Sequence, residues 1–196
     1  MKKISIALVA ATLLIGACTD RPERAAPVPS PPRSPSPQPS PQAAFQMESQ
    51  VYAAVIRQLV MKDHTFGNGS SPFDRVFVVD GAVRGAGGPM RSFQERASEP
   101  FADDLKQEIL DRLTDLPPVE FVVDPETVRK GADGMGGVKD SGVIITLGRI
   151  KRKAGKIQIS NGLWCGGKCG QWLTYVLEPR GSSWRITGTT GPNVIS

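Results

Sequence analysis

Two cysteines in the last third of the chain are the residues whose type and spacing best suit chemistry. They enclose a short glycine-containing segment, Cys165-Gly166-Gly167-Lys168-Cys169. In an extended strand, residues four apart are separated by about 13 Å, whereas a disulfide requires Cα atoms within about 7 Å. The chain must turn for a disulfide to form, and the intervening glycines permit such a turn. The spacing predicts a structural disulfide, with a thiolate pair for Cu(I) binding or thiol exchange as the alternative.

The spacing of Cys165 and Cys169 resembles that of membrane-anchored copper chaperones with a thioredoxin fold. In that family a proline follows the second cysteine, and a histidine lies far downstream. In this chain Gly170 replaces the proline, and the single histidine, His64, lies upstream. Strand-like sequence also follows the second cysteine, where the family has a helix. Because of these departures from the family pattern, copper or thiol handling by the two cysteines is kept as the alternative to a structural disulfide.

Other combinations of reactive residues point less clearly to chemistry. Gly162, Gly167 and Lys168 have the spacing of a phosphate-binding loop, but Cys169 replaces the Ser or Thr that binds magnesium. With one histidine, a catalytic triad or metal site cannot be drawn without choosing its partners arbitrarily. Five aspartates lie near the ends of expected elements, where aspartate commonly caps or turns: Asp63, Asp74, Asp80, Asp124 and Asp140. We therefore expect that the protein is not an enzyme and binds no cofactor. A hydrolase that uses some of these aspartates is a further alternative.

A group of basic residues surrounds an expected hairpin turn at Ala154-Gly155. Its members are Arg149, Lys151, Arg152, Lys153 and Lys156. These side chains could contact anionic lipid or a cell-wall polymer, at about 1 kcal/mol per charge near a charged surface. Alternatively, they form a solvated hairpin whose lysines protect a strand edge. The group is thus a candidate surface-binding site.

The amino terminus carries an export signal. Lys2 and Lys3 precede a small or apolar run from Ile4 to Ala17, which is the pattern of a secretory signal peptide. The run ends in Leu14-Ile15-Gly16-Ala17-Cys18, which resembles the lipobox of bacterial lipoproteins. In that family the cysteine receives a diacylglyceryl group, and the signal peptide is removed before it. The resemblance implies lipidation of Cys18, anchoring on the extracytoplasmic face of a cell membrane and an oxidising surrounding.

The residues after Cys18 have the composition of a tether. Prolines occur at positions 22, 27, 29, 31, 32, 35, 37, 39 and 41. Proline favours the polyproline II conformation, and no apolar periodicity accompanies it. We expect residues 18–44 to form a disordered spacer and residues 45–196 to form one globular domain. The formal charge of +5 falls to +3 once Lys2 and Lys3 are removed, which is too little to indicate nucleic-acid binding.

Within the domain, apolar periodicity predicts two helices, each followed by a buried strand. The helices are expected at 47–61 and 98–116, and the strands at 75–80 and 119–124. The last third predicts four further strands, at 142–150, 156–163, 172–177 and 184–187. A chain in which the helices come first and an antiparallel meander comes last is typical of an α+β fold. We expect the helices to lie on one face of the sheet.

The stretch from Gly162 to Ser196 resembles the end of a loose group of uncharacterised bacterial domains. The resemblance rests on Cys165-Gly166, Cys169-Gly170, Tyr175-Val176-Leu177-Glu178 and Trp184-Arg185-Ile186. It implies no activity. The sequence therefore favours a lipid-anchored, non-enzymatic binding or interaction domain. Its partner could be a protein or the cell wall, and its ligand is not identified by any motif.

Overall fold

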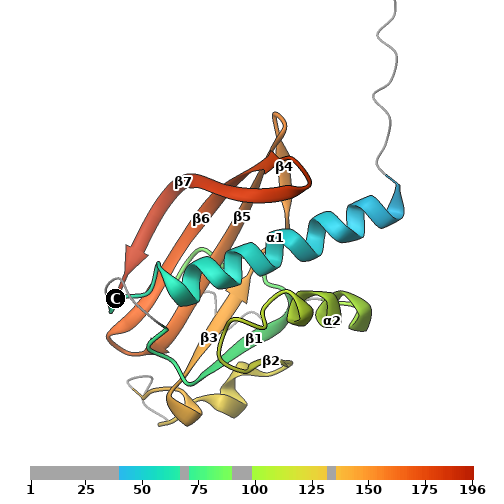
Figure 1. The fold of residues 1–196 in the computed structure, drawn as a ribbon. Helices are drawn as coiled ribbons and strands as arrows, with labels where there is room; N and C mark the ends of the chain where they lie inside the picture. Colours follow the sequence, from blue (N-terminus) through green and yellow to red (C-terminus); the bar gives the residue numbers. More distant parts are fainter. Residues whose placement is uncertain (1–39, 67–70, 90–98, 132–135) are drawn as a thin grey trace, which may run out of the picture. The chain divides into compact units, whose positions relative to one another are not determined.

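The computed structural model describes residues 40–66, 71–89, 99–131 and 136–196 (Figure 1). The predicted signal peptide, Cys18 and most of the predicted tether lie outside these residues. The chain from residue 40 onward belongs to one compact unit. It combines two α-helices with a seven-stranded mixed sheet. No helix of the described residues is both long and apolar enough to cross a membrane.

Helix α1, Pro41–Met61, begins earlier than the sequence predicted. The side chain of Ser40 accepts a hydrogen bond from the backbone N–H of Ala43 at 3.2 Å, and Pro41 occupies the first turn. Proline is tolerated there because its missing N–H would have no helical partner, and its fixed φ suits a helix. A serine and a proline that the sequence analysis placed in the spacer therefore form the start of this helix.

The sheet has the strand order β2-β1-β3-β5-β6-β7, with β4 paired to β5 (Figure 1). The strands are β1 (Arg75–Ala82), β2 (Val119–Val122), β3 (Gly142–Leu147), β4 (Lys151–Lys153), β5 (Lys156–Gly166), β6 (Cys169–Arg180) and β7 (Ser183–Ile195). Two short 3-10 helices, η1 (Pro125–Val128) and η2 (Lys139–Ser141), precede β3.

The prediction of an α+β fold is only partly confirmed, because three strands are parallel. Strand β1 lies between β2 and β3 and runs parallel to both. The pairs β3–β5, β5–β6 and β6–β7 are antiparallel, as expected for a meander. Strand β3 is buried along its whole length, and a parallel strand covered on both faces has such a continuous apolar sequence. The fold is a mixed α/β arrangement.

Helix α2, Asp103–Asp111, is shorter than the predicted helix at 98–116. Its start is fixed by Asp80, a buried residue near the end of β1. The Asp80 carboxylate accepts the backbone N–H of Phe101 at 3.1 Å and contacts Lys106 Nζ at 3.1 Å. Leu113 and Leu116 follow the helix but still pack against the core. Apolar spacing thus identified most of the packed residues, with Leu110 outside the core, but overestimated the length of the helix.

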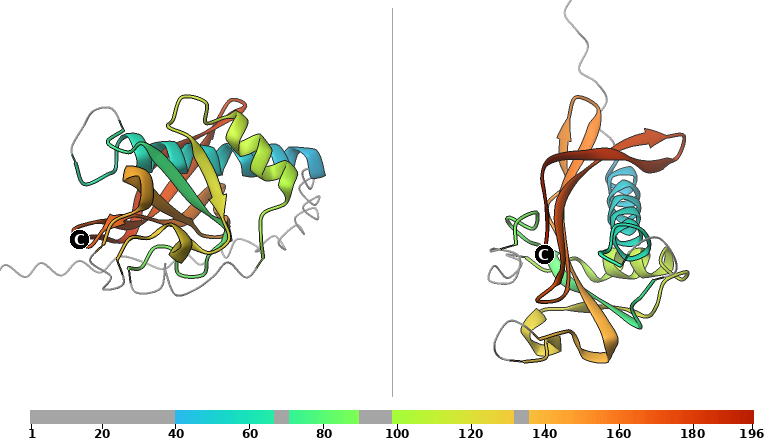
Figure 2. Two further views of the ribbon diagram at one scale, coloured as in Figure 1. Left: turned by 90° about the horizontal axis from the view of Figure 1, so that it is seen from below. Right: turned by 90° about the vertical axis from the view of Figure 1, so that its left-hand side faces the viewer.

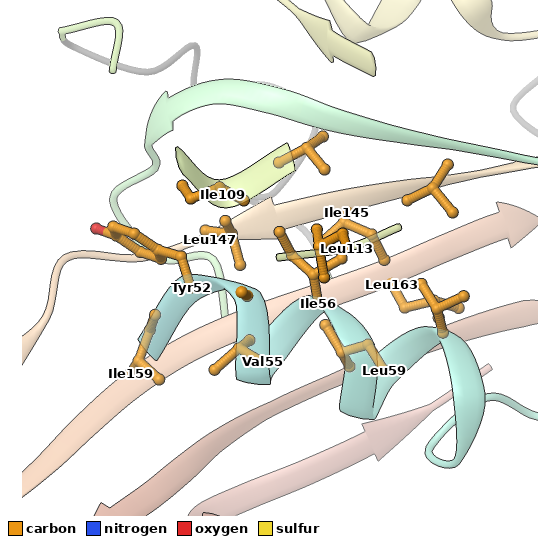
Figure 3. Close-up of a cluster of buried hydrophobic side chains, with 14 of the residues drawn as sticks. Tyr52, Val55, Ile56, Leu59, Ile109, Leu113, Ile145, Leu147, Ile159 and Leu163 are labelled. Atoms are coloured by element: carbon orange, nitrogen blue, oxygen red, sulfur yellow. The ribbon is translucent and has the colours of Figure 1, made fainter. Parts of the chain in front are cut away.

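The two faces of the sheet have separate apolar cores. Both helices pack on one face, as the prediction placed them (Figure 2, right). Figure 3 shows this core, in which Tyr52, Ile56 and Leu59 of α1 meet side chains of β3 and β5. The opposite face is covered by loops and η1, and its core residues are Phe77, Val79, Val83, Ala86, Val122, Val128, Val138, Ile144, Trp164 and Trp172.

Candidate functional site

Two hollows lie at the carboxyl ends of the parallel strands β1 and β3. The large hollow has a volume of about 540 Å³ and the small hollow about 270 Å³. Ala82, which ends β1, and Arg149, which follows β3, line both hollows. Ligands of open α/β sheets bind beyond the carboxyl ends of the strands, since the connecting loops diverge there. This edge of the sheet is therefore the candidate site.

The small hollow is lined by Ala82, Val83, Arg84, Gly85, Gly148, Arg149, Lys151 and Ser160. Arg84 is held at the small hollow because the residues on either side of it have fixed positions. Val83 and Ala86 are buried in the second core, and the Val83 N–H donates to the Leu147 carbonyl at 2.7 Å. Gly85 has a φ of 77°, a left-handed conformation that suits glycine. Arg84 is left exposed at the strand end.

Arg149 is positioned by the glycine before it. The Gly148 N–H donates to the Ser160 carbonyl at 2.7 Å, and the Gly148 carbonyl accepts the Tyr52 hydroxyl at 3.4 Å. A Cβ atom on Gly148 would lie 2.8 Å from the Ser160 carbonyl oxygen, so the close approach requires glycine. Arg149 then projects from a fixed backbone, and Lys151 begins β4 beside it.

The small hollow is strongly cationic. Arg84, Arg149 and Lys151 line it, and the lining contains no acidic residue from the part of the chain that the structure describes. None of the three forms an ion pair with a described carboxylate. A lining that holds three cations and no described acid attracts anions. Guanidinium groups also bind carboxylate or phosphate through two parallel hydrogen bonds.

The large hollow combines apolar and charged side chains. It is lined by Met47, Glu48, Tyr52, Ala82, Glu99, Pro100, Phe101, Ala102, Leu105, Arg149, Ile150 and Arg152. Burial raises the pKa of Glu48 above its ordinary value. Burial, followed by the nearby charge of Glu48, raises the pKa of Tyr52. Tyr52 is therefore a neutral hydrogen-bond donor at physiological pH, and the Glu48 carboxyl group is more easily neutralised than an exposed one.

The structure divides the predicted basic group. Arg149, Lys151 and Arg152 line the hollows, whereas Lys156 pairs with Glu178 at 2.5 Å. Lys153 is exposed where β4 meets its turn. Sequence reasoning missed Arg84, since only the pairing of β1 with β3 brings it beside Arg149. The glycine-rich loop after β1 gave no separate signal for this residue.

The predicted disulfide is present at the opposite end of β5. Cys165 and Cys169 are bonded across the turn between β5 and β6, with a Cα–Cα distance of 5.2 Å. Lys168 in this turn is exposed. The Thr65 hydroxyl lies 3.6 Å from the Cys169 sulfur. Cys169 is buried, so the bond is enclosed by the fold on one side.

Four of the five singled-out aspartates make side-chain contacts, and one of these, Asp140, lies 4.0 Å from Arg75 in an exposed ion pair. Asp80 anchors the start of α2, as described above. Asp124 accepts the backbone N–H of Glu126 at 3.1 Å and caps η1. Asp63 accepts the Tyr175 hydroxyl at 2.6 Å.

His64 is buried, and burial lowers its pKa. Its Nδ1 accepts the backbone N–H of Phe66 at 3.3 Å. Its ring lies edge-on to Phe73, with centroids 6.0 Å apart. In the described part of the chain, no group of three or more His, Cys, Asp or Glu side chains is arranged to hold a metal ion.

Comparison with protein-family models, curated proteins and solved structures found no match. The candidate site therefore rests on its own geometry: two neighbouring hollows, three cations that have no ion-pair partner among the described residues, and a fixed backbone at the ends of parallel strands.

Proposed function

We propose that this protein is a lipid-anchored, non-enzymatic binding domain that holds an anionic ligand at the small hollow. The observation that supports this proposal best is the convergence of Arg84, Arg149 and Lys151 without a described counter-ion. The three side chains are exposed, and an anion held among them would interact favourably with all three charges. The large hollow, at about 540 Å³, has the volume of a small-ligand site, whereas the small hollow, at about 270 Å³, is just below that range and suits a compact anionic group.

Two features of the sequence support the anchored part of the proposal. The Ile15-Gly16-Ala17-Cys18 boundary resembles a lipobox, and the proline-rich segment that follows suits a spacer. A domain held in this way would be displayed on the extracytoplasmic side of a membrane. The disulfide is compatible with that compartment, because disulfides persist where the surroundings are oxidising.

Binding without catalysis is favoured by how the acidic groups are used. Asp80, Asp63 and Asp124 accept backbone or side-chain hydrogen bonds that hold elements together. None of them lines either hollow. The carboxylates that do, Glu48 and Glu99, lie in the large hollow beside apolar residues rather than beside a nucleophile–base pair.

Anion binding is tested with a chain that begins at residue 19 and so keeps the whole described unit. Calorimetry with inorganic phosphate at low salt should detect binding that weakens as salt is added. Arg149→Gln should reduce the affinity about tenfold. The matched control is Lys168→Gln, which removes one charge from the exposed turn at the other end of β5. Equal affinities of the two variants would contradict the proposed site.

The anchor is tested separately in cells. Cys18→Ser should release the protein from the membrane fraction or leave the precursor uncut. Metabolic labelling with a fatty acid analogue provides the direct readout. Label that still enters the variant would show that Cys18 is not the lipidated residue.

Copper or thiol handling by Cys165 and Cys169 is the alternative proposal. It requires reduced, accessible thiols, whereas the two sulfurs are bonded and Cys169 is buried in the structure. Alkylation of exported protein before and after denaturation separates the two possibilities. Two thiols that react before denaturation would favour the alternative.

A further inference from the structure

We propose that the anionic ligand is an amphiphile, with its charged group in the small hollow and its apolar segment in the large hollow. This inference rests on the proposed function and specifies the chemical class of the ligand. The two hollows share Ala82 and Arg149, so they adjoin at the end of β1, and the proposed ligand reaches from one hollow to the other past these two side chains. The shared arginine would lie where the charged group joins the apolar segment.

The large hollow offers a surface suited to an apolar segment. Phe101 and Leu105 form part of its wall and are themselves nearly buried, at 8% and 6% exposure. Met47 and Ile150 are half-buried and pack against the same core. Covering these side chains with an alkyl chain removes apolar surface from water, which favours binding. An anion without an apolar segment would leave this surface exposed.

The charges fix the direction in which such a molecule lies. An anionic group in the large hollow would meet two acids, Glu48 and Glu99, as well as two arginines, Arg149 and Arg152. In the small hollow it would meet Arg84, Arg149 and Lys151 and no described acid. The two glutamates would repel an anionic group in the large hollow, so the anionic end is directed to the small hollow. The apolar end then has only the large hollow available within the site.

The charged group is defined by chemistry rather than by source. Two arginines and one lysine recognise a phosphate or a carboxylate, and arginine binds either through paired hydrogen bonds. The same anionic group could belong to a lipid, to an alkyl phosphate or to free phosphate. Probes that share the phosphate and differ in the apolar segment distinguish these sources.

The test compares three probes on the chain beginning at residue 19. Dodecyl phosphate below its micelle concentration carries both parts, inorganic phosphate carries the anion alone, and dodecyl maltoside carries the apolar segment alone. Dodecyl phosphate should bind at least about tenfold more tightly than either of the others. Arg149→Gln should weaken both phosphate probes, whereas Lys168→Gln should change neither.

A second variant isolates the apolar segment. Ala102 is exposed and lines only the large hollow, so Ala102→Trp should occupy that space. It should remove the advantage of dodecyl phosphate and leave the affinity for inorganic phosphate unchanged. Unchanged phosphate binding also shows that the variant is folded. Ala102→Ser, which adds little volume at the same position, should keep the advantage.

The remaining outcomes overturn either the amphiphile inference alone or the amphiphile inference together with the anion site. Equal affinities for dodecyl phosphate and inorganic phosphate would overturn the amphiphile inference and leave the anion site intact. Dodecyl maltoside binding as tightly as dodecyl phosphate would overturn both, because charge would then contribute nothing. Absence of binding by all three probes would also overturn both.

Discussion

The two ends of the parallel strands β1 and β3 use their polar groups in opposite ways. At the amino ends, Arg75 pairs with Glu120 at 3.5 Å and lies 4.0 Å from Asp140. The nearby turn between β5 and β6 is closed by the disulfide. At the carboxyl ends, Arg84 and Arg149 have no ion-pair partner among the described residues.

This difference suggests that the amino ends of the strands stabilise the fold, whereas the carboxyl ends are free to bind a ligand. Surface ion pairs stabilise by at most about 1 kcal/mol each, but a disulfide and close packing add more, so the amino end holds the strands together. The hollow at that end, of about 360 Å³, has Lys130 as the one charged residue in its described lining. Unpaired charges at the carboxyl end contribute nothing to folding, which is why we assign binding to that end.

The largest effect on stability is expected at the amino end, from Gly142→Ala. A Cβ atom there would lie 2.8 Å from the Lys139 carbonyl oxygen and 2.8 Å from the Phe77 ring. Overpacking of this kind costs about 2–3 kcal/mol. Urea unfolding should show the loss, while phosphate affinity of the folded variant stays unchanged.

The control for this change lies at the opposite end. A Cβ atom on Gly88 would have its nearest neighbour at 3.6 Å, which is an ordinary contact. Gly88→Ala should therefore change the free energy of unfolding by less than about 0.5 kcal/mol. If both variants were equally stable, the amino end would not be the tightly packed one.

Removal of the disulfide is the next largest effect. The double change Cys165→Ala and Cys169→Ala should lower the free energy of unfolding by about 2 kcal/mol, mainly because the unfolded chain gains freedom. The fold and the phosphate affinity should be retained, since the hollows lie at the other end of β5. Calorimetric melting of oxidised protein, reduced protein and the double variant measures the loss. A collapse of phosphate binding in the double variant would show that the two ends are coupled.

Local sequence patterns predicted the features that depend on neighbouring residues. The disulfide was predictable because its cysteines are four residues apart, and the buried face of α1 because its apolar spacing is helical. The parallel pairing of β1 with β3 was not, because it depends on contacts between distant segments. Arg84 was missed for the same reason. Helix α1 was placed too late because Ser40 and Pro41 suit a tether and a helix start equally well.

Glu48 should have a smaller effect, and on binding rather than stability. Its carboxylate lies in the large hollow with Arg149, where it opposes an anionic ligand. Glu48→Gln should tighten phosphate binding at pH 7 by about 0.5–1 kcal/mol, a few-fold change. Glu120→Gln at the amino end removes the same charge and should have no effect.

The pH dependence gives an independent check on Glu48. Burial raises its pKa, so the carboxyl group takes up a proton at a higher pH than an exposed glutamate. As the pH falls through that raised pKa, the negative charge of Glu48 disappears, so the affinity of the wild type should rise relative to that of Glu48→Gln. The protonation of phosphate itself changes the affinity of both proteins equally. Parallel pH profiles of the two proteins would count against the assignment.

The smallest effect on stability is expected in the turn between β4 and β5, near the carboxyl ends of β1 and β3. Ala154 and Gly155 both have positive φ, at 49° and 77°, as a two-residue turn of type I′ requires. Alanine is strained there and glycine is not, so Ala154→Gly should stabilise the protein by about 0.5 kcal/mol. Gly155→Ala is the matched control: a Cβ atom would meet nothing within 4 Å, so its expected loss of about 1 kcal/mol is purely conformational. The melting temperature should rise for Ala154→Gly and fall for Gly155→Ala, with phosphate affinity unchanged in both variants. This result would show that the backbone strain at Ala154 is not required for phosphate binding. A shift in phosphate affinity with Ala154→Gly would instead show that the turn helps to position Arg149 and Lys151.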